Sequence, residues 1–300
     1  MPKVLINDGM SQEGIKMLKG AGFEVIDQKI PQEELPARIA PFEAIVVRSA
    51  TKVTREVIDG GKNLKVIVRG GVGVDNIDVK YAESKGIKVF NTPGASSASV
   101  AELALAHMFA LARFVIDANI TMRAGAWEKK KYAAGIELQG KTLGILGYGR
   151  IGKELGKRAL ALGMRVITYD PFVTEVEPPA LWVEKEALLR QSDFVSLHVP
   201  KLPEGPAIGA QEIAIMKDGA FIINCARGGV VDEKALLDAL NSGKLGGAGL
   251  DVFEKEPTDH WELIKHPKVS VTPHIGASTV EAQDRIGTEV AQILREFFHI

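Results

Sequence analysis

The sequence has 300 residues, of which 46% are hydrophobic and 25% are charged, and its formal net charge at pH 7 is −1. This length is sufficient for two domains with sizeable cores. A net charge so close to zero excludes a general electrostatic attraction to nucleic acid or to an anionic membrane, so neither is expected as a partner.

Two features bear on the compartment. The only cysteine, Cys225, excludes an intramolecular disulfide framework and fits a reducing environment. The first residues enter a β-type run directly, without the apolar stretch of a signal peptide, and no run of about 18 apolar residues follows. We therefore expect a cytoplasmic protein.

Short β-type runs alternate with helix-length polar segments along the chain. They lie at residues 3–7, 23–27, 44–48, 64–69 and 87–91, and then at 142–146, 165–169, 194–199, 220–225, 248–252 and 269–272. This alternation predicts parallel sheets with helices on both faces. We predict an α/β protein of two doubly wound parallel-sheet domains, Rossmann- or flavodoxin-like, with the active site in the cleft between them.

The expected border between the domains is the turn Asn91-Thr92-Pro93-Gly94. A last helix, opened by the capping box Ser278-Thr279-Val280-Glu281 and reaching Phe298, is expected to cross back to the first domain from a hinge near Gly276. Residues 1–94 with 277–300 would form the substrate-binding domain, and residues 95–276 the cofactor-binding domain.

A long helix is predicted from a second capping box, Ser99 to Glu102, through about Met122. Its early turns are apolar almost all round, which predicts burial on every side. Such a surface favours packing between domains and between subunits, so we expect a homodimer or a higher homo-oligomer. His107 within this helix is expected to be a packed histidine.

The run ending in Gly147-Tyr148-Gly149-Arg150-Ile151-Gly152 has the strand, glycine spacing and following helix of a dinucleotide-binding turn. Gly147 would make the tight turn, Gly149 would admit the pyrophosphate, and Gly152 would let helix and strand pack closely. The phosphates would lie on the N–H groups of the helix N-terminus.

Asp170 ends the next β-type run, about 20 residues after the glycines, where an acidic residue binds the adenosine ribose hydroxyls. It would repel a 2′-phosphate, and Pro171-Phe172 follow without an arginine, so the expected cofactor is NAD. The expected cofactor-binding residues are Gly147, Tyr148, Gly149, Arg150, Ile151, Gly152, Asp170, His198, Cys225 and Asp251.

Three side chains follow strands of this same sheet, at the edge where ligands collect. Arg227 follows 220–225, Glu256 follows 248–252, and His274 follows 269–272. An arginine can hold a carboxylate, and a histidine can exchange a proton with a carbonyl or hydroxyl oxygen. A neighbouring glutamate would favour the charged imidazolium. The set suits interconversion of a ketone and an alcohol.

Asn224-Cys225-Ala226-Arg227-Gly228-Gly229, Asp251 to Pro257 and Thr272-Pro273-His274-Ile275-Gly276 resemble the D-isomer-specific 2-hydroxyacid dehydrogenase family. Arg48 to Thr54 and Gly70 to Asp78 are most similar to its D-3-phosphoglycerate dehydrogenase branch. The resemblance implies that Arg227, Glu256 and His274 are catalytic, and that the backbone of Val72 and Gly73 binds the substrate carboxylate. It implies oxidation of D-3-phosphoglycerate in serine biosynthesis.

Arg48 and Arg69 stand at the carboxyl ends of two predicted strands of the first domain. Two guanidinium groups gathered in a nearly neutral chain favour a second anionic group on the substrate, such as a phosphate. Alternatively, each pairs with a local carboxylate such as Asp75 or Asp78.

Other functions remain open on the sequence. A glyoxylate or hydroxypyruvate reductase would use the same residues, and a distant alternative is an NAD-sensing corepressor of the same fold. Many phosphoglycerate dehydrogenases carry a C-terminal serine-sensing domain, whereas this sequence ends at Ile300, so feedback inhibition by serine stays an open question on the sequence. The spacing of His260, His266 and His299 suits no metal site.

Overall fold

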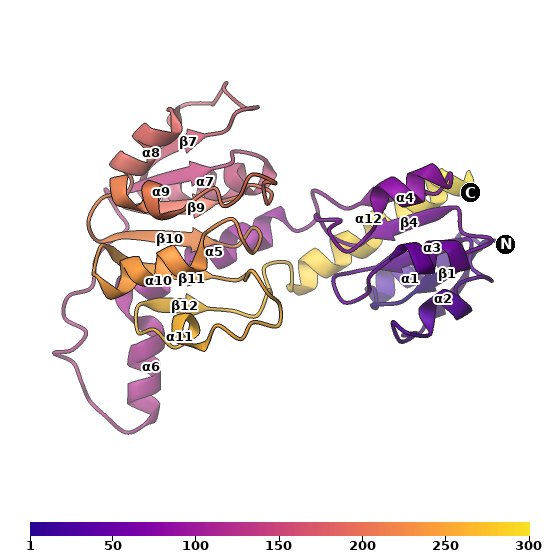
Figure 1. Cartoon of the computed structure of the whole chain (residues 1–300), viewed down its shortest axis with the longest axis horizontal. Helices are drawn as coiled ribbons and strands as arrows, with labels where there is room; N and C mark the ends of the chain where they lie inside the picture. Colours follow the sequence, from indigo (N-terminus) through magenta and orange to yellow (C-terminus); the bar gives the residue numbers. More distant parts are fainter. The chain divides into compact units, whose positions relative to one another are not determined.

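The computed structural model describes all 300 residues and divides them into two compact units (Figure 1). The first unit consists of Met1–Ser97 and Ala277–Ile300, and the second of Ala98–Gly276. Each contains one sheet in which every paired strand is parallel. The first unit extends to Ser97, beyond the border expected at Gly94.

The sheet of the first unit has five strands in the order β2-β1-β3-β4-β5. They are β1 (Lys3–Ile6), β2 (Glu24–Asp27), β3 (Ala44–Val47), β4 (Val66–Arg69) and β5 (Lys88–Asn91). This strand order is the flavodoxin-like form of the doubly wound sheet. The predicted runs match these strands, and most extend only one residue beyond them.

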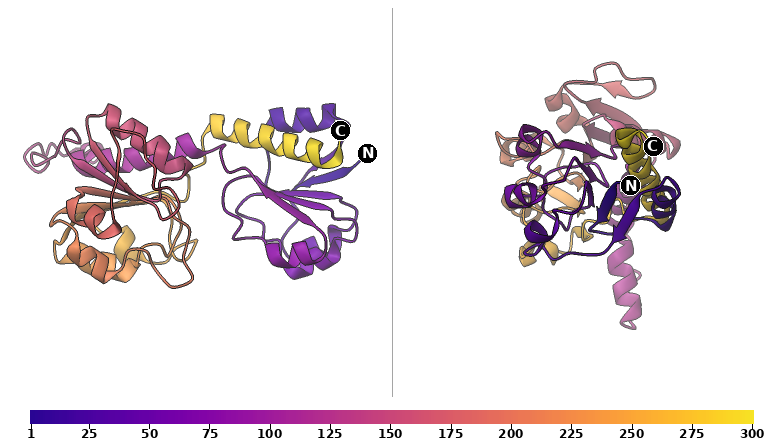
Figure 2. Two further views of the ribbon diagram at one scale, coloured as in Figure 1. Left: turned by 90° about the horizontal axis from the view of Figure 1, so that it is seen from above. Right: turned by 90° about the vertical axis from the view of Figure 1, so that its right-hand side faces the viewer.

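Alternating apolar residues cover both faces of this sheet. Val4, Ile6 and Val46 are buried with helices α1 (Gln12–Gly20) and α12 (Val280–Phe298), which lie side by side in Figure 2. Leu5 and Ile45 are buried on the other face, beneath α2 (Leu35–Arg38), α3 (Arg55–Gly60) and α4 (Val79–Ser84). The period of two along each strand is what places helices on both sides.

Helices α1 and α12 approach closely because glycines meet at their contact. A Cβ at Gly14 would lie 2.6 Å from the carbonyl oxygen of Gly287. The helix α12 begins at Val280, and the hydroxyl of Thr279 accepts the N–H of Ala282 at 3.1 Å. The predicted capping box from Ser278 to Glu281 is therefore wrong by one residue, because the third helical position is Ala282 and has no carboxylate.

The sheet of the second unit has seven strands in the order β12-β11-β10-β9-β6-β7-β8. They are β6 (Thr142–Leu146), β7 (Arg165–Tyr169), β8 (Leu181–Trp182), β9 (Phe194–Leu197), β10 (Ala220–Asn224), β11 (Leu245–Leu250) and β12 (Val269–Val271). Strand order reverses between β6 and β9, which is the switch point where ligands bind in Rossmann-type sheets. The predicted α/β class with two doubly wound parallel sheets is confirmed.

Two strands of this unit differ from the prediction. The two-residue strand β8 is too short to leave a pattern, and β11 begins at Leu245 rather than at Ala248. Glycines 246 and 247 read as breakers, yet a Cβ at Gly246 would lie 2.4 Å from the carbonyl oxygen of Gly219. These glycines are therefore part of the strand because neighbouring backbone leaves no room for a side chain.

Helices cover both faces of the second sheet as well. Leu155 of α7 (Arg150–Ala161) and Met108 of α5 (Ser97–Arg113) are buried with Ile145 and Val166 on one face. The other face packs against α8 (Lys185–Gln191), α9 (Ala210–Ile215), α10 (Glu233–Asn241) and α11 (Trp261–Ile264). The catalytic candidates follow strands whose positions these two layers fix.

The predicted helix from Ser99 to Met122 is two helices in the structure. Helix α5 begins earlier, so the predicted capping box lies inside it. Phe114 adopts a left-handed conformation, with φ of 54°, and separates α5 from α6 (Val115–Arg123), with a bend of 66°. No single helix is long and apolar enough to cross a membrane; only α5 and α6 taken together reach that length and composition.

The prediction that this region is buried on every side is wrong for the single chain. Phe109 on α5 is 41% exposed, and Ile120 on α6 is 60% exposed. The remaining large apolar side chains exposed along α6 are Val115, Ile116 and Met122. We use the name α5–α6 face for these exposed apolar residues taken together: Phe109, Val115, Ile116, Ile120 and Met122.

Candidate active site

At each of the three glycines after β6, a different steric requirement explains why the residue is a glycine. Gly147 has φ of +93°, and a Cβ there would lie 2.5 Å from the carbonyl oxygen of His198. A Cβ at Gly152 would lie 2.3 Å from the carbonyl oxygen of Gly147. Gly149 precedes α7, and a Cβ placed there meets no atom within 4 Å. This open space before a helix N-terminus suits an approaching phosphate.

Asp170 ends β7 and is bound to the glycine turn. Its Oδ2 accepts the N–H of Tyr148 at 2.8 Å, and its Oδ1 accepts the N–H of Phe172 at 2.8 Å. A carboxylate oxygen can accept more than one hydrogen bond, so both oxygens keep capacity for ribose hydroxyls. In the same turn, Arg150 is exposed and Ile151 is partly buried. The predicted cofactor residues 147–152 and Asp170 thus lie together.

His274 and Glu256 form a hydrogen-bonded pair in this unit. The Nδ1 atom of His274 lies 2.7 Å from Oε2 of Glu256, and both side chains are partly exposed. Because an ionised carboxylate only accepts hydrogen bonds, Nδ1 is the donor, and Nε2 is the nitrogen that can exchange a proton with a substrate. His274 has φ of 55°, an unusual conformation for a residue other than glycine.

The ionisation of Glu256 follows from its neighbours. Partial burial raises the pKa of Glu256, but the hydrogen bond and charge of His274, the N–H of Phe253 and the charge of Arg227 outweigh burial and lower it. Oε1 accepts the Phe253 N–H at 3.1 Å. Glu256 is therefore a carboxylate at neutral pH, as a partner of an imidazolium must be.

Arg227 lies in a turn that the side chain of Asn224 shapes. Asn224 accepts the N–H of Ala226 at 3.0 Å and donates to the carbonyl of Arg227 at 3.0 Å. Next to it, a Cβ at Gly228 would lie 1.8 Å from the carbonyl oxygen of Phe253. The loops after β10 and β11 therefore touch, which brings the charge of Arg227 within range of Glu256.

Asp251 accepts several hydrogen bonds from the segment that carries His274. It is 1% exposed; its Oδ1 accepts from Thr272 Oγ1 at 2.6 Å and from the N–H of Ile275 at 2.8 Å. Its Oδ2 accepts the N–H of Gly276 at 2.8 Å, and its carbonyl accepts the N–H of His274 at 2.8 Å. Asp251 was predicted as a cofactor residue, and the structure shows it fixing the loop that carries His274.

His198 and Cys225 complete the predicted cofactor set. Burial lowers the pKa of His198 to about 4, so its ring is neutral at neutral pH, and its Nε2 lies 2.9 Å from Oγ of Ser196. Burial and the charge of Asp251 raise the pKa of Cys225, so it stays a thiol. Neither side chain is suited to proton transfer at neutral pH.

The substrate residues predicted in the first unit lie on loops held by polar side chains. Asp8 accepts the N–H groups of Arg48 at 2.7 Å and Thr51 at 3.0 Å. Asn76 donates to the carbonyls of the same two residues at 2.7 and 2.6 Å. Asn91 donates to the carbonyl of Val72 at 2.5 Å, next to Gly73. No local pattern in the sequence predicts these carboxylate and amide anchors.

Arg48 and Arg69 extend from neighbouring strands. Val47 pairs with Arg69 in the sheet, so the two arginines leave the same edge. The guanidinium of Arg69 folds over the loop, with Nη1 donating to the carbonyl of Gly70 at 3.3 Å. The guanidinium of Arg48 makes no hydrogen bond or ion pair with the chain. Asp78, one of its alternative partners, pairs with Arg55 at 2.9 Å.

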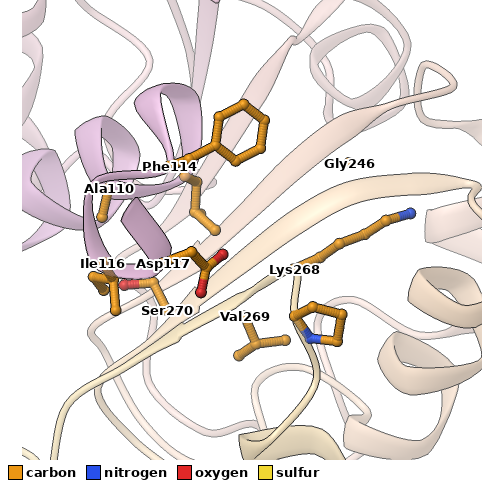
Figure 3. A pocket seen from close by; sticks show the side chains of 10 residues that line it. Ala110, Phe114, Ile116, Asp117, Gly246, Lys268, Val269 and Ser270 are labelled. Carbon is orange, nitrogen blue, oxygen red and sulfur yellow. The ribbon is translucent and has the colours of Figure 1, made fainter. Parts of the chain in front are cut away.

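A small pocket lies elsewhere in the second unit (Figure 3). Its volume is about 50 Å³, and it lies between the junction of α5 and α6 and the starts of β11 and β12. Phe114, Asp117, Gly246 and Ser270 are among the residues that line it. Catalytic candidates follow the opposite, carboxyl ends of these strands, so this pocket is not the active site.

Comparison with known proteins agrees with this geometry. Residues 105–276 match the family model of the D-isomer specific 2-hydroxyacid dehydrogenase, NAD binding domain. The chain is 50% identical over 296 residues to a hydroxypyruvate reductase of Thermotoga maritima, covering 97% of this chain and 96% of that protein. It is 47% identical over 301 residues to a D-3-phosphoglycerate dehydrogenase of Methanocaldococcus jannaschii, covering 99% of this chain and 57% of that protein. A solved D-lactate dehydrogenase of Aquifex aeolicus, complexed with NAD and lactic acid, has a TM-score of 0.82 at 32% identity and covers 99% of this chain and 95% of that chain.

The chain therefore belongs to the D-isomer specific 2-hydroxyacid dehydrogenase family, as the resemblance of its motifs predicted. It spans just over half the length of the phosphoglycerate dehydrogenase relative and nearly all of the hydroxypyruvate reductase. The prediction of NAD as cofactor is confirmed by the NAD-binding domain match. The open space at Gly149 and the spare capacity of Asp170 fit that cofactor.

Proposed function

We propose that the protein oxidises D-3-phosphoglycerate to 3-phosphohydroxypyruvate, reversibly and with NAD, as a step of serine biosynthesis. The observation that carries this proposal is the guanidinium of Arg48, which has no partner in the chain and leaves the same sheet edge as Arg69. A phosphate is the natural partner for such a guanidinium. The phosphoglycerate dehydrogenase relative supports the same substrate.

In this proposal, the protein's own residues orient the substrate and move its proton. Arg227 holds the substrate carboxylate, together with the backbone at Val72 and Gly73. During oxidation, Nε2 of His274 takes the proton of the substrate hydroxyl, and Glu256 stabilises the resulting imidazolium through Nδ1. Bound NAD supplies the two-electron oxidant. During reduction, the same imidazolium returns the proton to the carbonyl oxygen.

A second candidate is reduction of hydroxypyruvate or glyoxylate by the same residues. One observation favours it: the hydroxypyruvate reductase of Thermotoga maritima matches this chain over nearly the full length of both proteins. The two candidates differ in whether the substrate carries a phosphate. If the substrate is hydroxypyruvate or glyoxylate, Arg48 has no phosphate to bind and would have a different role.

A substrate panel tests the proposal. Purified protein is assayed by NADH absorbance with 3-phosphohydroxypyruvate, hydroxypyruvate and glyoxylate, and in the forward direction with D-3-phosphoglycerate. We expect the highest kcat/KM with the phosphorylated ketone. A higher kcat/KM with hydroxypyruvate or glyoxylate would establish the second candidate instead, and absence of turnover with every substrate would contradict both.

The cofactor preference should depend on Asp170. Its carboxylate would accept hydrogen bonds from the ribose hydroxyls of NADH and repel the 2′-phosphate of NADPH. We expect kcat/KM for NADH to exceed that for NADPH by about tenfold or more, the loss expected for one charge-assisted hydrogen bond. Asp170→Asn should reduce this ratio, whereas the exposed control Asp218→Asn should not. Equal efficiency of the wild type with both cofactors would refute the assignment.

We further propose that the protein forms at least a dimer through the α5–α6 face. Supporting this, large apolar side chains on that face are left exposed in the single chain, an arrangement that monomers rarely tolerate. Ile120→Asp should lower the mass measured by sedimentation at micromolar concentration to that of one chain. Val280→Asp, at an exposed apolar residue of α12, should leave it unchanged. A wild type that sediments as a monomer would exclude this proposal.

A cytoplasmic location is part of the same proposal. The chain has a single cysteine, Cys225, and it is buried, so no disulfide can form within the chain, which supports a reducing compartment.

A further inference from the structure

We propose that His107, inside α5, is a positioning residue of the active site: through Thr272 it holds Asp251, and Asp251 holds the loop that carries His274. The inference rests on the proposed chemistry of His274, whichever 2-hydroxy acid is the substrate. It was not expected from the sequence, which predicted only a packed histidine.

The side chain of His107 is enclosed and fully engaged. It is 2% exposed; its Nδ1 lies 2.8 Å from Oγ of Ser270, and its Nε2 lies 3.1 Å from Oγ1 of Thr272. Gly249 in β11 leaves room for the ring, because a Cβ there would lie 2.6 Å from the Cβ of His107. The imidazole therefore contacts two hydroxyls that are two residues apart, one in β12 and one directly after it, and packing alone requires neither contact.

The direction of each hydrogen bond follows from the carboxylate at the inner end. Asp251 can only accept, so the hydroxyl of Thr272 donates to it at 2.6 Å. Thr272 must then accept from the N–H at Nε2 of His107. Burial lowers the pKa of His107 despite the charge of Asp251, so the ring is neutral and has a single N–H. Its Nδ1 therefore accepts from Ser270, and the chain runs from Ser270 through His107 and Thr272 to Asp251.

This series of hydrogen bonds ends at the loop that sets the backbone conformation of His274. The carboxylate of Asp251 accepts the N–H groups of Ile275 and Gly276, and its backbone carbonyl accepts that of His274. His274 adopts φ of 55°, a conformation that persists only where surrounding contacts enforce it. The hydrogen bonds from Ser270 through His107 and Thr272 fix the orientation of Asp251, and Asp251 fixes the loop that carries His274. Losing these hydrogen bonds should therefore misplace His274 relative to Glu256 and slow proton transfer.

A double-mutant cycle tests the inference with the substrate that the wild type turns over fastest. His107→Phe removes both hydrogen bonds with similar volume, and Thr272→Val removes the hydroxyl without changing shape. Each should lower kcat about three- to tenfold with little change in the substrate KM, the size expected for one neutral hydrogen bond. The double variant should be no worse than Thr272→Val alone, because both changes break one chain. Thr272→Ser should restore wild-type kcat.

Controls separate this role from stability. Met108→Leu changes packing at the next, equally buried residue of α5 and should leave kcat unchanged even if Tm falls. Independent, multiplicative losses in the cycle, or a Thr272→Val variant with wild-type kcat, would overturn the inference. If His107→Phe does not fold, Thr272→Val and Thr272→Ser still decide it.

A measurement without turnover keeps the inference separable from the proposed function. Nitrogen-15 spectra of the histidine rings in the intact protein at pH 8 should show a ring that carries its proton on Nε2 and that is absent from His107→Phe. The neutral ring of His198 should be present in both spectra. A His107 ring that carries its proton on Nδ1 would overturn the proposed direction of the hydrogen bonds even if every substrate failed.

Discussion

Replacing His274 with Ala should lower kcat by about 10²- to 10⁴-fold, the usual contribution of a positioned proton-transfer group. Its Nδ1 is held by Glu256 at 2.7 Å, which leaves Nε2 as the atom that serves the substrate. The loss should appear in both directions of the reaction, because the same nitrogen accepts the hydroxyl proton and returns it. Steady-state rates with NADH and with NAD check this, and the binding of NADH, followed by fluorescence, should change little.

Two further variants sharpen that test. His266→Ala, at another histidine of the same unit, should keep the wild-type rate. Glu256→Gln should lower kcat in both directions, because Nδ1 of His274 loses the carboxylate that accepts its proton in a hydrogen bond. A His274→Ala enzyme within tenfold of wild type would exclude His274 as the acid–base group, and a Glu256→Gln variant with wild-type kcat would remove Glu256 from the mechanism.

The strands and the placement of the candidate catalytic residues could be predicted because their signals are local. A β-type run followed by glycines defines the turn after β6, and the carboxyl ends of parallel strands gather at one edge. Arg227, Glu256 and His274 needed only this rule to be placed in one region. The start of helix α10 is also a local feature: Asp232, a residue type typical of helix N-caps, accepts the N–H of Ala235 at 2.9 Å.

What the sequence did not reveal depends on contacts between distant segments. Nothing local marks Phe114 as a left-handed residue that divides α5 from α6. The hydrogen bonds to Asp251 form only where β11, β12 and the loop after β12 meet. The side chains that hold the backbone of Arg48 are those of Asp8 and Asn76, which lie on separate loops. Ser278 and Thr279 both have side chains that can cap a helix, so the local sequence does not decide which of them is the N-cap of α12; in the structure it is Thr279.

Arg48→Ala should raise KM for 3-phosphohydroxypyruvate while leaving the weaker turnover of hydroxypyruvate nearly unchanged. The backbone of Arg48 is fixed by Asp8 and Asn76, so its guanidinium is presented at the sheet edge without a partner in the chain. Losing a charge-assisted hydrogen bond costs about 1.5–3 kcal/mol, which corresponds to roughly 10–150-fold in binding. The substitution removes no internal ion pair, so the fold should be retained, and unfolding curves of both proteins check this.

The prediction is specific because a loss is expected with 3-phosphohydroxypyruvate and almost none with hydroxypyruvate. Arg38→Ala in the same unit, which removes an exposed pair with Glu34, should affect neither substrate. Adding inorganic phosphate should inhibit wild type by competing for Arg48, and it should inhibit Arg48→Ala less. Equal losses on both ketones would mean that Arg48 binds the carboxylate or supports the fold. The phosphate would then have no assigned cation beyond Arg69, and the hydroxypyruvate reductase activity would become the better account of the protein.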